Sequence, residues 1–275
     1  MVAKISKFAD DTKLGMNVAK EGNTTRLQED LRKIGEWSET WQMPFDVNKC
    51  KVMHIGHRNP RTEYNLKGNA LISTDTEKDL GVTITSDLKF SKQCIEAEKK
   101  AQRMLGYIKR QFGYRNKEIV LCLYNSLVRP HLEYAVQFWS PSYRKDIARL
   151  ERVQARATKL IPSLRHKSYK DRLVELDLFS LETRRLRGQL IEVFKILRGF
   201  DNVDYRDIFQ LSEGTTRNHG YKLELKRYNR DLCGKFFTYS ICGTWNALPA
   251  DVVNSNSVDQ FKSRLDKALN HRLGV

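Results

Sequence analysis

The sequence predicts an α+β protein that is predominantly helical. Up to about residue 88, apolar residues come in short alternating runs separated by turn residues, which is the pattern of half-buried strands. From Ser91 onward they recur every three or four residues, which is the pattern of amphipathic helices. The charge changes at the same place: residues 1–88 hold 13 Lys and Arg against 13 Asp and Glu, whereas residues 89–275 hold 36 against 20 and carry the whole net charge of +16.

The composition limits the class of protein. A chain of 275 residues with 40% hydrophobic residues can bury a core and is expected to form one or two domains. The basic excess after residue 88 predicts a surface that faces a polyanion, most simply nucleic acid, with a solvated helical surface as the alternative. Five scattered cysteines, no signal peptide and no apolar run of membrane-spanning length predict an intracellular protein of the nucleus or cytoplasm, with no membrane partner.

The first element is expected to be a hairpin around two adjacent carboxylates, in the run Phe8-Ala9-Asp10-Asp11-Thr12-Lys13-Leu14. Neighbouring side chains on a strand point to opposite faces, so Asp10 and Asp11 can converge on one ion only at a tight turn. Carboxylate oxygens in such a turn suit Mg²⁺. The alternative is a solvated turn without a ligand.

A helix is expected next, followed by strands. Thr25 and Gln28 have the spacing of a capping box. Leu27, Leu31, Ile34, Trp37 (or Ser38) and Trp41 follow at helical spacing up to Pro44. Alternation from Val47 to Ile55 predicts a half-buried strand. Residues 70–88 look like a second strand region, with an acidic turn at Asp75-Thr76-Glu77 and a domain boundary near Asp87.

Five helices are predicted after the boundary, with a further packing helix between the last two. They cover the stretch from Ser91 to Phe112, a helix capped by Asn116 and stopped by Pro130, Lys145 to Leu160, Ser180 to Leu197, and Val258 to Leu269. Leu232 to Asn246 is expected to form one packing helix that contains Trp245. Leu223 and Leu225 suggest a short strand.

Several of these runs, in this order, carry a resemblance. They are Phe8-Ala9-Asp10-Asp11, the helix with Trp37 and Trp41, Phe45-Asp46-Val47-Asn48-Lys49-Cys50-Lys51-Val52-Met53-His54-Ile55-Gly56, Leu80-Gly81-Val82, Leu127-Val128-Arg129-Pro130-His131-Leu132-Glu133-Tyr134-Ala135, Leu150-Glu151-Arg152-Val153-Gln154 and Trp245-Asn246-Ala247-Leu248-Pro249. Together they resemble the back half of a reverse transcriptase from a non-LTR retrotransposon of the jockey-like, LINE type. The resemblance extends over nearly the whole chain.

The resemblance implies an architecture and an activity. Residues 1–88 would be the remnant of a polymerase palm, residues 89–200 a helical thumb-like basic region, and residues 201–275 a C-terminal extension. The parent activity would be RNA-directed DNA synthesis, a nucleotidyl transfer with Mg²⁺, dNTPs and an RNA template. Asp10 would be the direct metal ligand and Asp11 its support, and Leu80, Gly81 and Val82 would form the primer grip. Lys49 would stand near the leaving pyrophosphate, with Lys51 as the alternative on the same strand face; the family pattern alone favours Lys49.

The same resemblance leads us to expect an incomplete polymerase. Seven residues precede Phe8, so an earlier palm strand with a third metal-binding aspartate is expected to be missing, together with the fingers. Because a two-metal site normally needs three or more carboxylates, we expect weak Mg²⁺ binding and no polymerisation by this chain alone. The alternatives are a non-enzymatic module that binds RNA or hybrid duplex, and a palm encoded upstream.

A basic segment is the strongest candidate for a nucleic-acid surface. Between Arg144 and Arg172 ten basic residues stand against three acidic ones, and one face of the predicted helix is basic opposite its apolar stripe. We expect this segment to follow the phosphates of an RNA–DNA or DNA duplex with little sequence preference. The residues assigned to it are Arg144, Lys145, Arg149, Arg152, Arg156 and Lys159. A solvated face is the alternative.

Overall fold

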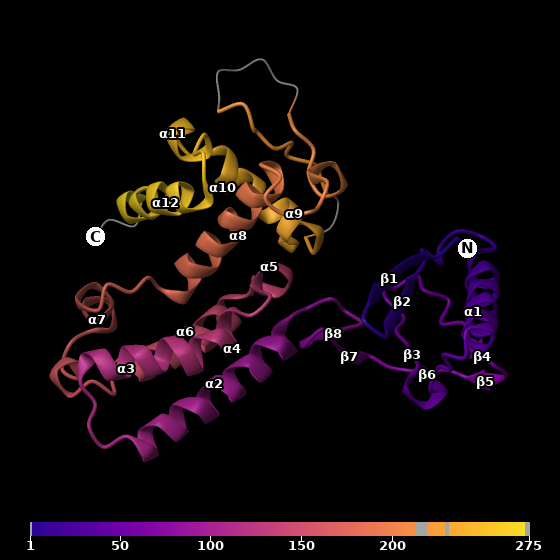
Figure 1. Ribbon diagram of the computed structural model, residues 1–275, viewed down its shortest axis with the longest axis horizontal. Helices are drawn as coiled ribbons and strands as arrows, with labels where there is room; N and C mark the ends of the chain where they lie inside the picture. Colours follow the sequence, from indigo (N-terminus) through magenta and orange to yellow (C-terminus); the bar gives the residue numbers. More distant parts are fainter. Residues whose placement is uncertain (1, 213–218, 229–230, 273–275) are drawn as a thin grey trace. The chain divides into compact units, whose positions relative to one another are not determined.

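The computed structural model describes residues 2–212, 219–228 and 231–272 and has a mixed α+β fold that is rich in helix (Figure 1). The chain forms two compact units, Met1–Lys92 and Gln93–Val275, which we call unit 1 and unit 2. The break lies close to the change in charge and apolar period. Among the described residues, no helix is both long and apolar enough to cross a membrane.

Unit 1 is built from one long helix and short paired strands. Its elements are β1 (Lys4–Phe8), β2 (Asp11–Gly15), α1 (Asn23–Thr40), the 3₁₀ helix η1 (Val47–Lys49), β3 (Lys51–Val52), β4 (Asn65–Leu66), β5 (Asn69–Ala70), β6 (Ile72–Ser73), β7 (Thr76–Asp79) and β8 (Val82–Thr85). The pairs β1–β2, β4–β5 and β7–β8 are antiparallel hairpins, and β3–β6 is parallel. The hairpin predicted at the start of the chain is confirmed.

Helix α1 holds unit 1 together, but not in the predicted way. The capping box is wrong, because the helix begins at Asn23 after a left-handed Gly22 (φ 77°) without a side-chain cap. Gln28 instead bonds the N–H and C=O of Asn65 on β4, both at 2.8 Å. The buried Asp30 accepts hydrogen bonds from Ala3 N and Val2 N at 2.7 Å, and these bonds, that from Ala3 first, lower the pKa of Asp30. The side chains of α1 thereby tie both flanking hairpins to the helix.

Two predicted core positions on α1 lie outside the core. The helix buries Leu31, Ile34 and Ser38, whereas the side chains of Trp37 and Trp41 are 39% and 65% exposed. Of the two alternatives for one position, Trp37 and Ser38, the buried one is Ser38. It donates to Gly35 O at 2.8 Å and so satisfies its hydroxyl inside the helix.

The strands predicted for residues 47–55 and 70–88 are replaced by shorter pieces. Asp46 accepts a hydrogen bond from Asn48 N and starts η1, which takes Val47 to Lys49 out of an extended conformation. In the second region the predicted acidic turn is wrong, because Thr76 and Glu77 lie in β7. The chain turns at Leu80-Gly81 instead, where both residues have positive φ (44° and 83°), the conformation of tight hairpin turns.

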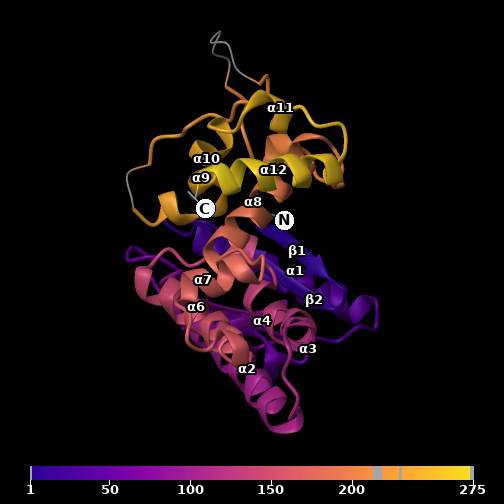
Figure 2. The ribbon, with the colours of Figure 1, turned by 90° about the vertical axis from the view of Figure 1, so that its left-hand side faces the viewer.

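Unit 2 is helical. Its elements are α2 (Ser91–Gln111), α3 (Lys117–Leu123), the π-helical segment η2 (Tyr124–Val128), α4 (Arg129–Glu133), α5 (Val136–Trp139), α6 (Arg144–Thr158), η3 (Pro162–Leu164), α7 (Tyr169–Glu175), α8 (Leu181–Leu197), η4 (Tyr205–Asp207), η5 (Cys233–Lys235), α9 (Phe237–Ser240), α10 (Cys242–Asn246), α11 (Ala250–Val253) and α12 (Val258–Arg272). Figure 2 shows α2, α3, α4 and α6 as one group, with α8 leading from it to α10, α11 and α12.

The predicted helices of unit 2 are largely present, with two corrections. Asn116 caps α3 by accepting from Ile119 N, and Ser180 caps α8 by accepting from Thr183 N. The stop predicted at Pro130 is wrong, because α3, η2 and α4 run on to Glu133. Proline has no N–H to donate inside a helix. The π-helical segment directly before it bonds Arg129 N to Tyr124 O, and the helix continues through Pro130. The single helix predicted for residues 232–246 is three short ones, η5, α9 and α10.

The C-terminal core of unit 2 packs α8 against α10 and α12. Phe194 on α8 stacks on Phe261 of α12 with ring centroids 4.2 Å apart, and Trp245 lies 6.1 Å from Phe261. Trp245 also donates from Nε1 to Tyr221 O at 2.8 Å. The described residues of the predicted C-terminal extension (201–275) that lie in this core, among them Trp245 and Phe261, pack together with α8. Leu223, predicted to be in a strand, forms one antiparallel bridge with Leu211.

His219 is a buried titratable side chain in this core. Its ring is buried against Trp245, Nδ1 accepts from Tyr221 N at 3.2 Å, and Nε2 reaches no hydrogen-bond partner among the described residues. Burial, and then the nearby Lys222, lower the pKa of His219.

Because the folded protein favours the neutral ring, His219 contributes its full stability above its ordinary pKa of about 6.5. We expect this contribution to be lost as the pH falls below that value. Denaturant unfolding between pH 5 and 7 should show a shallower loss for His219→Asn, which keeps an acceptor but does not titrate. An identical slope for both proteins would contradict this assignment.

Candidate nucleic-acid interface

The Asp-Asp hairpin stands at the surface of unit 1. Phe8 pairs with Asp11, so Ala9 and Asp10 form the two-residue turn, and Ala9 has a left-handed φ of 52°. Both aspartates are exposed. Their oxygens are of the type that Mg²⁺ prefers, but no group of three or more His, Cys, Asp or Glu suited to a metal occurs in the described part of the chain. The carboxylate oxygens of Asp10 and Asp11 are too few to fill an octahedral metal site.

A salt bridge joins this hairpin to the one predicted as the primer grip. Lys13 on β2 pairs with Asp79, the last residue of β7, immediately before the Leu80-Gly81 turn. The salt bridge therefore links the strand that follows the two aspartates to the strand that precedes the Leu80-Gly81 turn. No pattern in the sequence indicates this pair, because opposite charges so far apart along the chain match many other partners equally well.

Lys49 lies on η1 and is largely exposed. Its ammonium is 3.4 Å from Asp46, and Lys51 on β3 pairs with Glu77 at 2.8 Å. Both lysines therefore have carboxylate neighbours, and the contacts described for them do not include Asp10 or Asp11. The role of Lys49 beside a leaving pyrophosphate stays a prediction.

The basic segment of unit 2 forms the outer face of α6. Helical spacing places five of the six predicted residues, Lys145, Arg149, Arg152, Arg156 and Lys159, on one face, opposite the buried Leu150, Val153 and Ala157. Arg152, Arg156 and Lys159 are exposed and have no carboxylate partner among the described residues. We call Lys145, Arg152, Arg156 and Lys159 the α6 basic face.

Arg149 differs from its neighbours on α6. It donates to Glu98 of α2 at 2.7 Å, and this hydrogen bond raises the pKa of Arg149. Its charge is therefore largely offset inside unit 2, and the pair fixes α6 against α2. Arg144 precedes the face at the start of the helix and is exposed.

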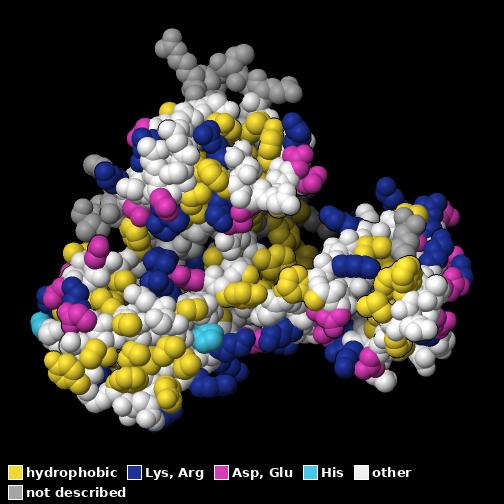
Figure 3. All heavy atoms as spheres, viewed as in Figure 1, with side chains coloured by type: hydrophobic (Ala, Val, Ile, Leu, Met, Phe, Trp, Pro, Cys, Tyr) yellow, Lys and Arg dark blue, Asp and Glu magenta, His cyan; other side chains and the backbone are white. Residues whose placement is uncertain are grey.

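Helix α2 carries a second exposed basic stripe that was not assigned to the site from the sequence. Lys99, Arg103 and Arg110 are exposed and follow one another after four and seven residues, about one and two helical turns, opposite the buried Cys94, Ala101 and Ile108. Figure 3 shows Lys and Arg side chains along the edge that α2 forms. The sequence does contain a signal for this stripe, because the helical spacing places these basic residues opposite the apolar ones.

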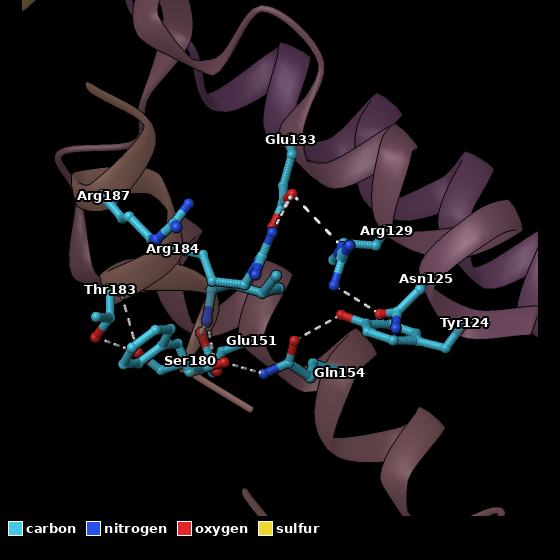
Figure 4. A network of polar contacts seen from close by, with 12 residues as sticks. Tyr124, Asn125, Arg129, Glu133, Glu151, Gln154, Ser180, Thr183, Arg184 and Arg187 are labelled. Atoms are coloured by element: carbon cyan, nitrogen blue, oxygen red, sulfur yellow. Dashed lines mark hydrogen bonds and ion pairs between the residues drawn. The ribbon is translucent and has the colours of Figure 1, made fainter. Parts of the chain in front are cut away.

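A buried polar network holds the inner side of α6 (Figure 4). Gln154, fully buried, accepts from Tyr124 Oη at 2.6 Å and donates to Tyr169 Oη at 3.1 Å and to Phe179 O at 2.9 Å. Glu151 accepts from Leu181 N at the first turn of α8 and from Tyr169. Burial raises the pKa of both tyrosines, which stay neutral donors. The network fixes the helix whose other face is basic.

Gln154→Leu should cost about 1–3 kcal/mol of unfolding free energy, because the buried Tyr124 hydroxyl loses its acceptor and Phe179 O loses its donor. Adding Tyr124→Phe should recover part of that loss, since one stranded group is removed as well. Chemical denaturation of the two single variants and the double variant measures the coupling. Strictly additive losses would show that the two side chains do not act as a pair.

A second polar cluster orders the same region. Glu133 at the end of α4 pairs with Arg184 of α8 and lies 3.6 Å from Arg129. Arg129 also donates to Asn125 Oδ1 at 2.6 Å. The continuous α3–η2–α4 helix is in this way tied to α8, and through Glu151 to α6.

Comparison with known proteins agrees with the motifs. No family profile and no solved structure matches the chain. The RNA-directed DNA polymerase from mobile element jockey of Drosophila melanogaster is 24% identical over 162 residues, which is 57% of this chain and 18% of that protein. The chain thus spans less than a fifth of the length of this relative. The similarity supports a relationship between this chain and the LINE-like reverse transcriptases.

Proposed function

We propose that this chain derives from the RNA-directed DNA polymerase of a non-LTR mobile element and binds RNA or an RNA–DNA duplex through unit 2. Unit 1 would correspond to the end of the palm and unit 2 to the thumb-like region and C-terminal extension. The observation that carries the proposal is the α6 basic face: four exposed cations on a helix whose opposite side is fixed by a buried network.

The chemistry of the two basic helices favours binding to phosphates rather than to bases. Arg and Lys side chains on a rigid helix face neutralise successive phosphates and release counterions, so binding is strong at low salt and has little sequence preference. Helix α2 adds three more exposed cations on a second face. A duplex, whose phosphates are regularly spaced, is the partner that such a face suits best.

The aspartate hairpin would be the inherited half of a catalytic site. Asp10 and Asp11 offer the right type of oxygen but too few of them for a two-metal centre. We propose that transfer of a dNTP onto a primer needs at least one further carboxylate strand, and that binding of the duplex does not need the hairpin at all.

Primer extension and duplex binding, measured side by side, test this proposal. The chain should bind a primed RNA template and should not extend the primer in Mg²⁺ with dNTPs. Asp10→Asn/Asp11→Asn should bind equally well. Extension by the unmodified chain that the double variant abolishes would contradict the binding-only function and show that the pair catalyses with ligands from elsewhere in the chain.

A further inference from the structure

One aromatic ring at the start of α6 lies close to two ammonium groups. Lys145 Nζ is 5.8 Å and Lys235 Nζ is 4.3 Å from the ring centroid of Tyr143. Lys145 comes from the first turn of α6, and Lys235 comes from η5, far along the sequence. Both lysines are exposed, and neither has a carboxylate partner among the described residues. Two unneutralised positive charges at one ring make this place attractive to an anion.

A second aromatic group lies beside Lys235. The ring of Tyr228 covers Gly234 so closely that a Cβ at this position would collide with the ring. Tyr228 stands edge-on to Tyr239, with centroids 6.0 Å apart, and is half exposed. Gly234 therefore lets a half-exposed tyrosine pack on the chain directly before Lys235. We call Tyr143, Tyr228, Lys145 and Lys235 the tyrosine–lysine platform.

Exposed aromatic faces together with ammonium groups fit a single strand of nucleic acid. Bases of a single strand are free to stack on aromatic side chains, whereas those of a duplex are hidden in its interior. The ammonium groups contact the phosphates between stacked bases. An acidic peptide would use the charges but not the exposed ring face of Tyr228.

The position of the platform relates it to the α6 basic face. Lys145 belongs to both, and the other cations of α6 continue from it along the same side of the helix. At about 1.5 Å per residue, Lys145 and Lys159 are separated by roughly 21 Å along the axis. Tyr143 therefore lies at the N-terminal end of the α6 basic face.

We propose that the tyrosine–lysine platform binds a single strand that continues from the duplex held on α6. The inference rests on the proposed function, since it takes nucleic acid as the polyanion. The platform would be a second binding surface, specific for single strands rather than for a duplex. The segment around Lys235 contributes to it and would therefore have a role in binding.

Comparison of two ligands tests the proposal on the full chain. A short blunt RNA–DNA hybrid and the same hybrid with a single-stranded DNA extension are titrated by fluorescence anisotropy. The extension should tighten binding about tenfold, roughly the effect of stacking one base. Tyr228→Leu/Lys235→Gln should lose this gain but bind the blunt hybrid like the unmodified chain. Tyr228→Phe, which keeps the ring, should retain the gain.

Controls distinguish a failure of the platform proposal from a failure of the proposed function. Lys267→Gln, which removes an exposed charge from α12, should leave both affinities unchanged. If the blunt hybrid binds but the extension adds nothing, or if poly-glutamate displaces the extended strand as well as a single-stranded oligonucleotide does, the platform is not a single-strand site. If the unmodified chain does not bind the blunt hybrid, the proposed function fails and this inference fails with it.

Discussion

Trp245→Ala should destabilise unit 2 by about 3–5 kcal/mol, the usual cost of truncating a fully buried tryptophan. Its ring is 1% exposed and packs against Phe261 and His219, and its N–H donates to Tyr221 O. Truncation leaves a cavity between α10 and α12 and leaves the Tyr221 carbonyl without its donor. Denaturant unfolding, followed by far-ultraviolet circular dichroism, measures the loss.

Two matched variants serve as controls for Trp245→Ala. Trp245→Phe should cost less than the alanine variant, because most of the packing remains and only part of the cavity opens. Tyr114→Ala removes an aromatic ring that is 74% exposed in the same unit and should change stability by about 0.5 kcal/mol or less. Equal losses for Trp245→Ala and Tyr114→Ala would mean that the core is not organised around Trp245.

Arg152→Ala/Arg156→Ala should weaken binding of an RNA–DNA hybrid by roughly 25- to 60-fold at 0.1 M salt, as expected if each arginine neutralises one phosphate. Both side chains are exposed and lie on the outer face of α6, opposite its buried network. The fold should therefore be unaffected. Titration at several salt concentrations should show the slope of log K against log salt falling by about 1.5–2.

A charge-matched control distinguishes a contact from a change in net charge. Arg206→Ala/Lys267→Ala removes the same charge from η4 and α12, and Arg206 is 75% exposed. Because exposed charges beyond the Debye length are largely screened, this variant should lose about threefold or less. If both double variants weaken binding equally, the α6 basic face is not a specific contact surface.

The helices of unit 2 could be predicted from the sequence because their signals are local. The apolar period of α2, α6 and α8, the cap at Asn116 and the cap at Ser180 involve neighbouring residues only. The same is true of the Asp-Asp hairpin, where strand, turn and strand follow directly. Trp245 was placed in a packing helix for the same reason.

Three details of the helices were not predicted, because more than one local arrangement fits the same residues. Pro130 continues a helix because a π-helical segment precedes it, and Thr25 does not cap α1 because the helix begins earlier, at Asn23. Trp37 and Trp41 are exposed because Ser38 satisfies its own hydroxyl and takes the buried place. In each case the helix starts, continues or packs differently from what the rule for that residue type predicts.

In the candidate site, too, local patterns could be predicted and contacts between distant residues could not. The α6 basic face was visible as a pattern, but the pairing of Arg149 with Glu98 depends on how α2 packs against α6. The salt bridge between Lys13 and Asp79, and the approach of Lys235 to Tyr143, join residues that are far apart along the chain. These contacts separate the cations that are offset inside the fold from those that are free to meet a ligand.

The affinity of the full chain for an RNA–DNA hybrid, measured between 50 and 200 mM salt, tests the central claim most directly. The unmodified chain and Asp10→Asn/Asp11→Asn should bind with the same Kd at each salt concentration. Four phosphate contacts on α6 predict a log–log slope of about −3 to −4, steeper with the cations of α2. A chain that fails to bind at the lowest salt, or binds with an affinity that salt leaves unchanged, would contradict the account.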